Sequence, residues 1–240
     1  MFGRGMRPKP DPATQIEAIR QEYFRRESRS SRSVGPVVLQ TRREWYARML
    51  TALDLIPLGE RRVLDVGCRT GDWLAGCCRD WGGRPENCVG IDITDWSLEA
   101  WRRCNPHSLI TLTCGSAHDM PFADSAFDLV HQSMMLSSIL DPELRRAVAD
   151  EMWRVLRPGG FILSYDFWIN PLNWKTVGIR LSSLRRLFPH ARLAHRRTIT
   201  LAPPISRALA GLPAVWTRGL ERLGLLNTHN LVALQKPGDD

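Results

Sequence analysis

The sequence predicts a doubly wound α/β fold built on a mostly parallel sheet, and two observations support this prediction. Between residues 62 and 166, short apolar runs alternate with segments of amphipathic helical periodicity. Strands that alternate with helices form right-handed crossovers, and the resulting parallel sheet is covered on both faces. The chain has 240 residues, of which 43% are hydrophobic, and this is enough to bury the core of one such domain.

The region before the sheet is predicted to be helical. Residues 1–13 are basic and lack the apolar stretch of a signal peptide, so we expect a disordered tail. Thr14 and Glu17 have the spacing of a capping box, which predicts a helix over residues 14–26. A second helix is predicted over residues 38–53.

The second helix is expected to face the core through residues that recur at helical spacing, namely Trp45, Met49 and Ala52. Residues 14–56 are therefore expected to form a helical lid or substrate cap. Residues 57–240 are expected to form the α/β domain, with a helical insertion at about residues 204–224.

The alternating segments define the elements of the sheet domain in order. The predicted strands are residues 62–66, 88–91, 109–113, 127–131 and 161–165. The predicted helices between them are residues 72–81, 97–104 and 142–156. The last of these is bounded by Asp141 as a cap, Pro142 in the first turn and the Pro158–Gly160 stop. A helix over 182–188 and strands over 192–201 and 230–234 complete the domain.

The cysteines and the charge pattern limit the classes of function. The six cysteines include no C-x-x-C pair and no histidine at metal-ligand spacing, so we expect reduced thiols, a cytoplasmic location, no metal site and no radical iron–sulfur chemistry. The net charge is +8, and residues 175–222 carry ten basic residues and one acidic residue. This basic segment favours an anionic substrate, a membrane surface or nucleic acid as a partner.

A glycine-rich turn follows the first predicted strand in the sequence VLDVGCRTGDWL. Gly67 and Gly71 allow the backbone to approach a ligand at the carboxyl end of the strand. The G-x-G-x-x-G pattern of nicotinamide cofactors is absent. Asp65 precedes the first glycine, and Asp92 ends the second strand, where its carboxylate can accept hydrogen bonds from two ribose hydroxyls. The alternative role for Asp92 is a helix N-cap.

Four blocks in this order, VLDVGCRTG, VGIDIT, GSAHDMPFADSAFDLV and MWRVLRPGGFIL, resemble class I S-adenosylmethionine-dependent methyltransferases. The resemblance is closest to the small-molecule type 11 group and covers about residues 62–166. It implies a Rossmann-like methyltransferase sheet with an antiparallel C-terminal strand, and S-adenosyl-L-methionine as the cofactor.

The resemblance also implies which residues bind the cofactor. They are Asp65, Gly67, Thr70, Gly71, Asp92, Ile93, Ser116, Ala117, Gln132 and Ser133. Asp65, Gly67 and Gly71 surround the aminocarboxypropyl end, with Thr70 near by, and Asp92 holds the ribose. Ile93 packs on the adenine, which Ser116 and Ala117 meet through a hydroxyl and a backbone N–H. Gln132 and Ser133 contact the methionine part through their backbone.

Two residues depart from the family pattern. Ser116 stands where the family usually has an aspartate that accepts from the adenine amino group, so this hydrogen bond has an uncharged acceptor. Arg69 stands where the family usually has glycine, and a left-handed backbone there costs arginine roughly 1–2 kcal/mol. We interpret the loop as functional, with the Arg69 side chain in solvent or, alternatively, donating to the cofactor carboxylate.

The resemblance predicts an enzyme that transfers a methyl group to a small molecule, with a hydroxyl group as the expected acceptor. A hydroxyl acceptor needs a base, and His131, which ends the fourth strand, is the first candidate. His118, in the preceding loop, is the second, although a structural role is the alternative for each histidine. Asp166 ends the fifth strand and is expected to face the substrate at the same edge.

Two other functions and several partners remain open at this level. The basic flanks favour an RNA methyltransferase, but the sequence shows no RNA-binding module, so RNA ranks below a small molecule, and DNA is not expected. A non-catalytic relative is the third hypothesis, and a homodimer stays open. The insertion at 204–224 is expected to pack against the sheet or the pocket rim. Alternatively, it binds a membrane peripherally and presents an anionic or lipid-linked acceptor.

Overall fold

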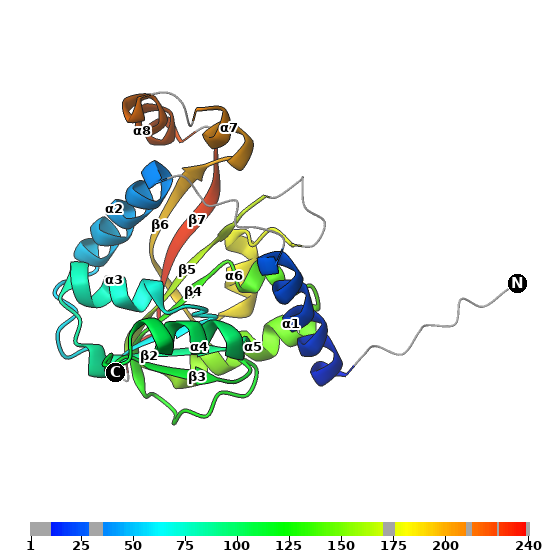
Figure 1. Cartoon of the computed structure of the whole chain (residues 1–240). Helices are drawn as coiled ribbons and strands as arrows, with labels where there is room; N and C mark the ends of the chain where they lie inside the picture. Colours follow the sequence, from blue (N-terminus) through cyan, green and yellow to red (C-terminus); the bar gives the residue numbers. More distant parts are fainter. Residues whose placement is uncertain (1–10, 29–35, 170–175, 210–212, 225, 239–240) are drawn as a thin grey trace, which may run out of the picture. The chain divides into compact units, whose positions relative to one another are not determined.

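The structure is a computed structural model that describes residues 11–28, 36–169, 176–209, 213–224 and 226–238 (Figure 1). Its contacts divide the chain into two units, residues 1–31 and 32–240. Helix α1 (Pro12–Ser28) belongs to the first unit and is described by itself. Residues 1–10 of the expected N-terminal tail lie outside the described residues.

Helix α1 begins two residues before its predicted start, and the predicted capping box is wrong. The Asp11 carboxylate accepts hydrogen bonds from the backbone N–H and the hydroxyl of Thr14, each at 2.9 Å. Pro12 follows at the first helical position, which its fixed φ suits. The backbone hydrogen bond from Thr14 lowers the pKa of Asp11. Asp11 therefore caps the helix at the place that Thr14 was expected to occupy.

The second unit contains one seven-stranded mixed sheet, which confirms the predicted fold class. The strand order is β3-β2-β1-β4-β5-β7-β6. The strands are β1 (Val63–Val66), β2 (Cys88–Asp92), β3 (Thr111–Cys114), β4 (Phe127–Ser133), β5 (Leu156–Phe167), β6 (Arg192–Leu201) and β7 (Asn227–Gln235). Strands β1 to β5 pair in parallel, and β7 is antiparallel to both of its neighbours.

The helices of the second unit include those that cover the sheet of a doubly wound fold. They are α2 (Pro36–Ala52), α3 (Asp72–Trp81), α4 (Asp95–Cys104), α5 (Pro142–Val155), α6 (Leu181–Leu187), α7 (Pro203–Ala208) and α8 (Ala214–Leu223). The turns η1 (Pro85–Asn87) and η2 (Leu136–Ser138) are short 3-10 helices. From β1 the strand order first runs outward through β2 and β3, and it then continues on the other side of β1 with β4 and β5. Right-handed crossovers therefore put α3 and α4 on one face and α5 on the opposite face.

The largest difference from the predicted elements is at the start of β5. The sequence Pro158–Gly160 was expected to end a helix, but it lies inside the strand, which begins directly after α5. Gly159 has a φ of +76°, and its N–H donates to the carbonyl of Lys236 at 2.9 Å. The chain end near β7 thus supplies a partner that the local sequence does not reveal, and glycine permits the left-handed backbone that this contact requires.

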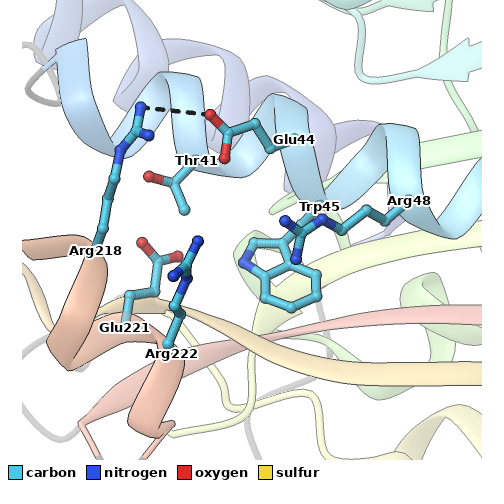
Figure 2. Close-up of a pocket in the computed structure, with 7 residues that line it drawn as sticks. All are labelled: Thr41, Glu44, Trp45, Arg48, Arg218, Glu221 and Arg222. Carbon is cyan, nitrogen blue, oxygen red and sulfur yellow. Dashed lines mark ion pairs between the residues drawn. The ribbon is translucent and has the colours of Figure 1, made fainter. Parts of the chain in front are cut away.

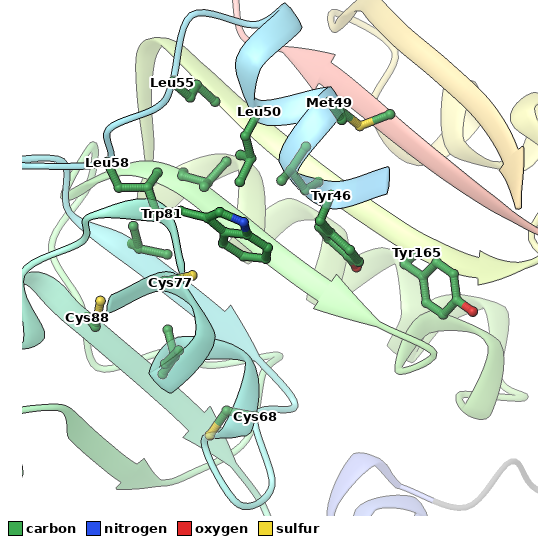
Figure 3. Packing of buried hydrophobic residues seen from close by; sticks show 14 of the residues in the cluster. Tyr46, Met49, Leu50, Leu55, Leu58, Cys68, Cys77, Trp81, Cys88 and Tyr165 are labelled. Atoms are coloured by element: carbon green, nitrogen blue, oxygen red, sulfur yellow. The ribbon is translucent and has the colours of Figure 1, made fainter. Parts of the chain in front are cut away.

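Helix α2 packs on the sheet through a face slightly different from the predicted one. Tyr46, Met49 and Leu50 are buried in one cluster with residues of β1, β4 and α3 (Figure 3). Trp45 is only partly buried, and Ala52 is exposed, so two of the three residues expected to face the core lie at its edge or outside it. The apolar residues of α2 occupy a broad arc, and the position of the sheet decides which part of that arc is inside.

Candidate active site

The carboxyl ends of four adjacent parallel strands bring the predicted cofactor residues into one row. Val66 of β1 lies beside Ile91 of β2 on one side and Gln132 of β4 on the other. Asp92 pairs with Cys114 of β3. The glycine turn follows Val66 directly, and Ser116 follows β3 by two residues. The structure therefore gathers segments that are far apart in the sequence at the edge where α/β sheets bind ligands.

The glycine turn has the left-handed backbone that its sequence suggested. The φ angles are +80° at Gly67, +47° at Arg69 and +65° at Gly71. A Cβ atom on Gly67 would lie 3.0 Å from Met135 Cγ, so a larger residue fits here only if the Met135 side chain shifts. Arg69 is exposed and carries the backbone strain, which costs about 1–2 kcal/mol. The loop thus keeps its conformation with arginine at its middle position.

Helix α3 begins at this turn with an open N-terminus. Its cap is Gly71, which has no side chain to accept from the first N–H groups. The Thr70 hydroxyl donates to the Asp72 carboxylate at 2.7 Å instead of binding the helix end. The unsatisfied N–H groups of a helix N-terminus attract anionic groups such as a carboxylate. This end of α3 is suited to the carboxylate of the implied cofactor.

Asp92 connects the glycine turn to the next helix. One oxygen of its carboxylate accepts from the N–H and the hydroxyl of Thr94 at 2.8 and 2.6 Å, and the other accepts from Arg69 N at 2.8 Å. The N-cap of α4 is Thr94, so the alternative assignment of Asp92 as the cap is wrong. Asp92 is 6% exposed. A carboxylate oxygen has two lone pairs, so the oxygen bound to Arg69 retains capacity for a ribose hydroxyl.

The loop after β3 carries Ser116, Ala117 and His118, all partly buried. Gly115 N–H donates to the carbonyl of Asp92 at 2.9 Å, which ties this loop to the end of β2. The Ser116 hydroxyl and His118 Nδ1 are hydrogen-bonded at 2.6 Å. The two residues therefore form a pair next to Asp92. Ile93, predicted to pack on the adenine, is also partly buried and follows Asp92 directly.

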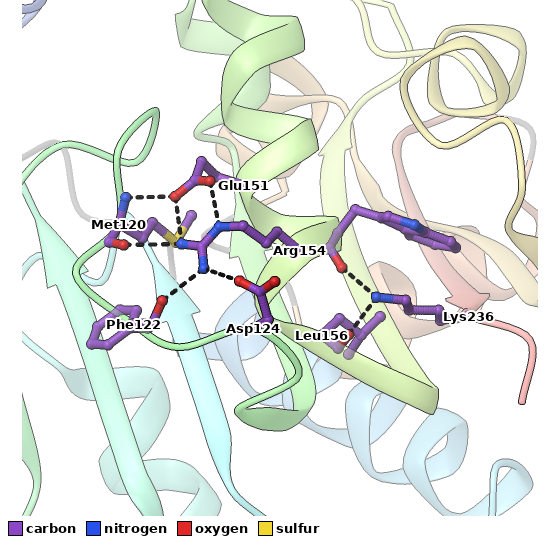
Figure 4. Close-up of polar contacts among 8 residues, drawn as sticks. Met120, Phe122, Asp124, Glu151, Arg154, Leu156 and Lys236 are labelled. Carbon is purple, nitrogen blue, oxygen red and sulfur yellow. Dashed lines mark hydrogen bonds and ion pairs between the residues drawn. The ribbon is translucent and has the colours of Figure 1, made fainter. Parts of the chain in front are cut away.

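An arginine of α5 holds the far part of the same loop (Figure 4). The Arg154 guanidinium donates to the carbonyls of Met120 and Phe122 at 3.0 and 2.8 Å and to the Asp124 carboxylate at 2.7 Å. It also donates twice to Glu151, which in turn accepts from Met120 N at 2.7 Å. We call this set of contacts the Arg154 clamp, and it fixes the loop against α5.

His131 lies inside the molecule as the middle of a hydrogen-bonded chain. Its Nδ1 is 2.7 Å from Asp65 Oδ1, and its Nε2 is 2.7 Å from the hydroxyl of Tyr46. It is 0% exposed, and Trp73 stacks on its ring at 3.7 Å between centroids. Both ring nitrogens are thus engaged by the protein. A role as general base requires that Tyr46 first move away, and that role stays a prediction.

Gln132 supports the segment after β4 through its side chain. Its Oε1 accepts from the N–H groups of Met135 and Leu136 at 3.0 and 3.3 Å, and its Nε2 donates to Ser164 Oγ at 2.7 Å. The side chain is fully buried, which leaves only the backbone for a cofactor contact. Ser133, partly buried, ends β4 beside it.

Asp166 does not face a substrate, and the expectation that it does is wrong. It is 1% exposed and accepts from the N–H groups of Ser137 and Phe167 at 3.1 and 3.0 Å. Burial raises its pKa to about 7. Asp166 is buried because η2 lies over the end of β5, and the strand pattern alone does not reveal this contact.

Two residues of this site were missed by the sequence reasoning, namely Tyr46 and Trp73. Tyr46 precedes Met49 and Leu50 at helical spacing, and this pattern could have identified it as the inward residue of α2. Trp73 lies in the first turn of α3, and its indole N–H is buried without an acceptor among the described residues. An unpartnered buried donor beside the glycine turn fits a ligand that supplies an oxygen or nitrogen acceptor.

Comparisons with known proteins agree with this geometry. Residues 63–160 match the family model described as a methyltransferase domain. The chain is 31% identical to demethylmenaquinone methyltransferase of Symbiobacterium thermophilum over 155 residues, which are 63% of this chain and 59% of that protein. It is 29% identical to 24-methylenesterol C-methyltransferase 2 of Oryza sativa over 65% of this chain and 46% of that protein. It is 35% identical to fatty-acid O-methyltransferase of Mycolicibacterium smegmatis over 44% of this chain and 37% of that protein.

The matched regions thus span from 37% to 59% of the lengths of these three relatives. The fold extends further than the sequence similarity. A putative sarcosine dimethylglycine methyltransferase from Galdieria sulphuraria superposes with a TM-score of 0.62 at 18% identity, covering 92% of this chain and 98% of that one. At this level of identity the superposition identifies a shared fold.

Proposed function

We propose that this chain, which contains a class I S-adenosylmethionine-dependent methyltransferase domain, transfers a methyl group to a small molecule with an apolar body. The observation that carries the proposal is the row of strand ends at the glycine turn. It combines an open helix N-terminus, the Asp92 carboxylate and the loop of Ser116 along one edge. An elongated cofactor with a carboxylate, a ribose and a base matches this order of groups.

The cofactor, when bound, supplies a methyl group on a sulfonium, whose thioether leaves without needing a proton. The residues of this chain then have to align the acceptor and exclude water, which contribute most of the rate enhancement in such displacements. In this proposal the end of α3 and Gly67 hold the aminocarboxypropyl end and Asp92 holds the ribose. Ser116, Ala117 and Ile93 surround the adenine.

The acceptor is proposed to be lipid-like. The names of the three relatives refer to a menaquinone, a sterol and a fatty acid, which all have a large apolar part. We further propose that the methyl group is transferred to an oxygen atom, and one relative is named as an O-methyltransferase. For a hydroxyl, His118 is the more accessible base, because it is partly buried whereas His131 is fully enclosed. The proposal also includes that the protein is cytoplasmic and that its acceptor is a small molecule and not RNA.

Cofactor binding tests the first half of the proposal. We expect calorimetric titration of the full chain with S-adenosylmethionine to give saturable binding, weakened by about 1–3 kcal/mol in Asp92→Ala because the ribose loses a charged acceptor. Glu99→Gln, an exposed position on α4, is the matched control and should bind as the parent does. The absence of heat with the parent chain would identify a non-catalytic relative. Unchanged affinity in a folded Asp92→Ala variant would remove the ribose assignment.

A methyl-transfer assay tests the second half of the proposal, which is the class of the acceptor. The chain is incubated with cofactor labelled in its methyl group and, separately, with a demethylated quinone, a sterol, a fatty acid and bulk RNA. We expect label in the organic extract of at least one apolar acceptor and none in RNA. Mass spectrometry and NMR of the product then distinguish a methoxy group or methyl ester from a methyl group on carbon. Label found only in RNA would overturn the small-molecule assignment.

A further inference from the structure

Helix α8 turns an apolar face to solvent. Val215, Trp216 and Leu223 are 69%, 62% and 67% exposed, and Leu226, just after the helix, is 41% exposed. At 100° per residue, the three helical positions fall within one arc of about 100°. A helix of a soluble protein usually directs such residues inward, so this face marks a contact surface. We call these four residues the α8 apolar face.

The inward side of α8 is polar and fixed in place. Glu221 is 2% exposed, and its Oε1 accepts from Thr200 N at 2.8 Å. Asn227 Nδ2 donates to the carbonyl of Glu221 at 2.9 Å. Arg218 pairs with Glu44 of α2 at 3.4 Å, and Figure 2 shows Arg218 and Glu221 directed toward that helix. These contacts to β6 and α2 set the rotation of α8, so the outward position of the apolar face is built into the fold.

The surroundings of the α8 apolar face are basic. The groove beside it is lined by Arg48, Arg218 and Arg222, and its two acidic residues are Glu44, which pairs with Arg218, and the buried Glu221. Arg222 borders the apolar face and lines the groove between α2 and α8. Across that groove, the Arg48 guanidinium lies 4.8 Å from the centre of the Trp45 ring (Figure 2). The Arg197 guanidinium of β6 lies at the same distance from that ring. We call Arg48, Arg197 and Arg222 the basic rim.

We propose that α8 docks on a membrane that contains anionic lipids, with its apolar face among the acyl chains and the basic rim at the headgroups. A tryptophan and leucines beside arginines suit this interface, where apolar area and positive charge add to binding. A second copy of the chain would bring another basic rim against the first and would meet like-charge repulsion. The described helices include none long and apolar enough to cross a membrane, so the docking is peripheral.

This docking goes beyond methyl transfer and gives the proposed lipid-like acceptor a source. An acceptor dissolved in a membrane would reach an enzyme bound at its surface without passing through water. The α8 apolar face shares no residue with the row of strand ends. Loss of docking and loss of cofactor binding can therefore be measured separately.

Sedimentation with vesicles tests the proposal on the full chain. We expect binding to phosphatidylcholine vesicles that contain 30% phosphatidylglycerol to be at least about tenfold tighter than to phosphatidylcholine alone, and to weaken at high salt. The variant Val215→Ser/Trp216→Ser should lose at least about tenfold of this binding. Leu109→Ser is the matched control, because Leu109 is 64% exposed but lies before β3. Its binding should equal that of the parent.

Three results would overturn the proposal. They are no binding to anionic vesicles at low salt, equal binding by the double variant and the parent, and a parent dimer in solution that the double variant dissociates. The last result would assign the α8 apolar face to a second copy of the chain. Cofactor affinity and melting temperature of the double variant should match the parent, which shows that the variant is folded and that the methyl-transfer site is intact.

Discussion

Arg69 shows at the scale of one residue how a non-glycine side chain can occupy the cofactor loop. Its φ of +47° lies in the left-handed region, which disfavours L-residues by about 1–2 kcal/mol. Its backbone N–H donates to the Asp92 carboxylate at 2.8 Å. This hydrogen bond is made by the backbone, so a glycine at this position can make it as well.

We therefore expect Arg69→Gly to raise the free energy of unfolding by up to about 1 kcal/mol, since relief of the strained backbone outweighs the greater unfolded-state freedom of glycine. Affinity for S-adenosylmethionine should stay within a few-fold. Chemical denaturation and calorimetry measure the two effects. Arg103→Gly, at an exposed position of α4, is the control for the same substitution in a helix, and it should lower stability by about 1 kcal/mol. A tenfold loss of affinity in Arg69→Gly would instead indicate a contact with the cofactor carboxylate.

Tyr46 contacts a histidine that is distant in the sequence, because its hydroxyl lies 2.7 Å from Nε2 of His131. We expect Tyr46→Phe to cost about 1–3 kcal/mol of stability, because a buried ring nitrogen loses its partner. Urea unfolding measures the loss, and the ring ¹⁵N shifts of His131 should change. Tyr165→Phe is the control, because it removes a buried hydroxyl bonded to Thr200 and should leave those shifts unaltered. Unchanged shifts in Tyr46→Phe would contradict the hydrogen-bonded chain.

At the scale of elements, the Arg154 clamp is the contact that connects α5 to the loop before β4. Glu151 and Arg154 lie one turn apart on α5, so both reach the same stretch of loop. Hydrogen bonds from Arg154 lower the pKa of Glu151. A lowered carboxyl pKa adds stability above the unfolded-state pKa, ordinarily 4.5, and this contribution is lost as the pH falls through the folded-state value.

Arg154→Ala should thus lower the free energy of unfolding by about 2–3 kcal/mol at pH 7, since loop carbonyls and two carboxylates lose a charged donor. The difference between variant and parent should shrink as the pH falls below 4.5 and through the lowered folded-state pKa of Glu151, because the carboxylate that Arg154 binds is then protonated. Thermal unfolding across pH measures this. Arg79→Ala, which removes an ion pair to the adjacent Asp80 at a side chain 61% exposed, should cost at most about 0.5 kcal/mol. A pH-independent difference for Arg154→Ala would show that Glu151 is not part of the clamp.

At the scale of the whole molecule, Asp166 couples the stability of the sheet unit to pH. It lies at the end of β5 beneath η2, and burial raises its pKa to about 7 from an ordinary value of 3.8. Between these two values the folded chain holds a proton that the unfolded chain has released. Stability therefore falls as the pH rises from about 4 to 7, and the loss is complete above pH 7.

We expect Asp166→Asn to remove this part of the pH dependence, because an amide does not titrate. The slope of the free energy of unfolding against pH between 4 and 7 should become less negative in the variant. Asp150→Asn, at an exposed position on α5, is the matched control and should leave the slope unchanged. Equal slopes for Asp166→Asn and the parent chain would show that Asp166 does not hold its proton in this range.

The sequence by itself predicted the fold class, the order of most elements and the resemblance of the central region to methyltransferases, which the family model matches over residues 63–160. Alternating apolar runs and helical segments are local patterns, and they specify crossovers whatever lies around them. The glycine turn and Asp92 follow their strands directly, so their place at the carboxyl edge is a consequence of parallel pairing. For this reason those residues could be named before the structure.

Only the tertiary structure decided which side chains were enclosed and what they met. His131 was chosen as a base from its strand-end position, but Tyr46 from α2 and Asp65 from β1 occupy both of its ring nitrogens. The helical insertion was predicted from its sequence, but the contacts of the buried Glu221 decide that Trp216 on α8 faces outward. Burial and hydrogen-bond partners come from segments distant in sequence, and no periodicity within one segment contains that information.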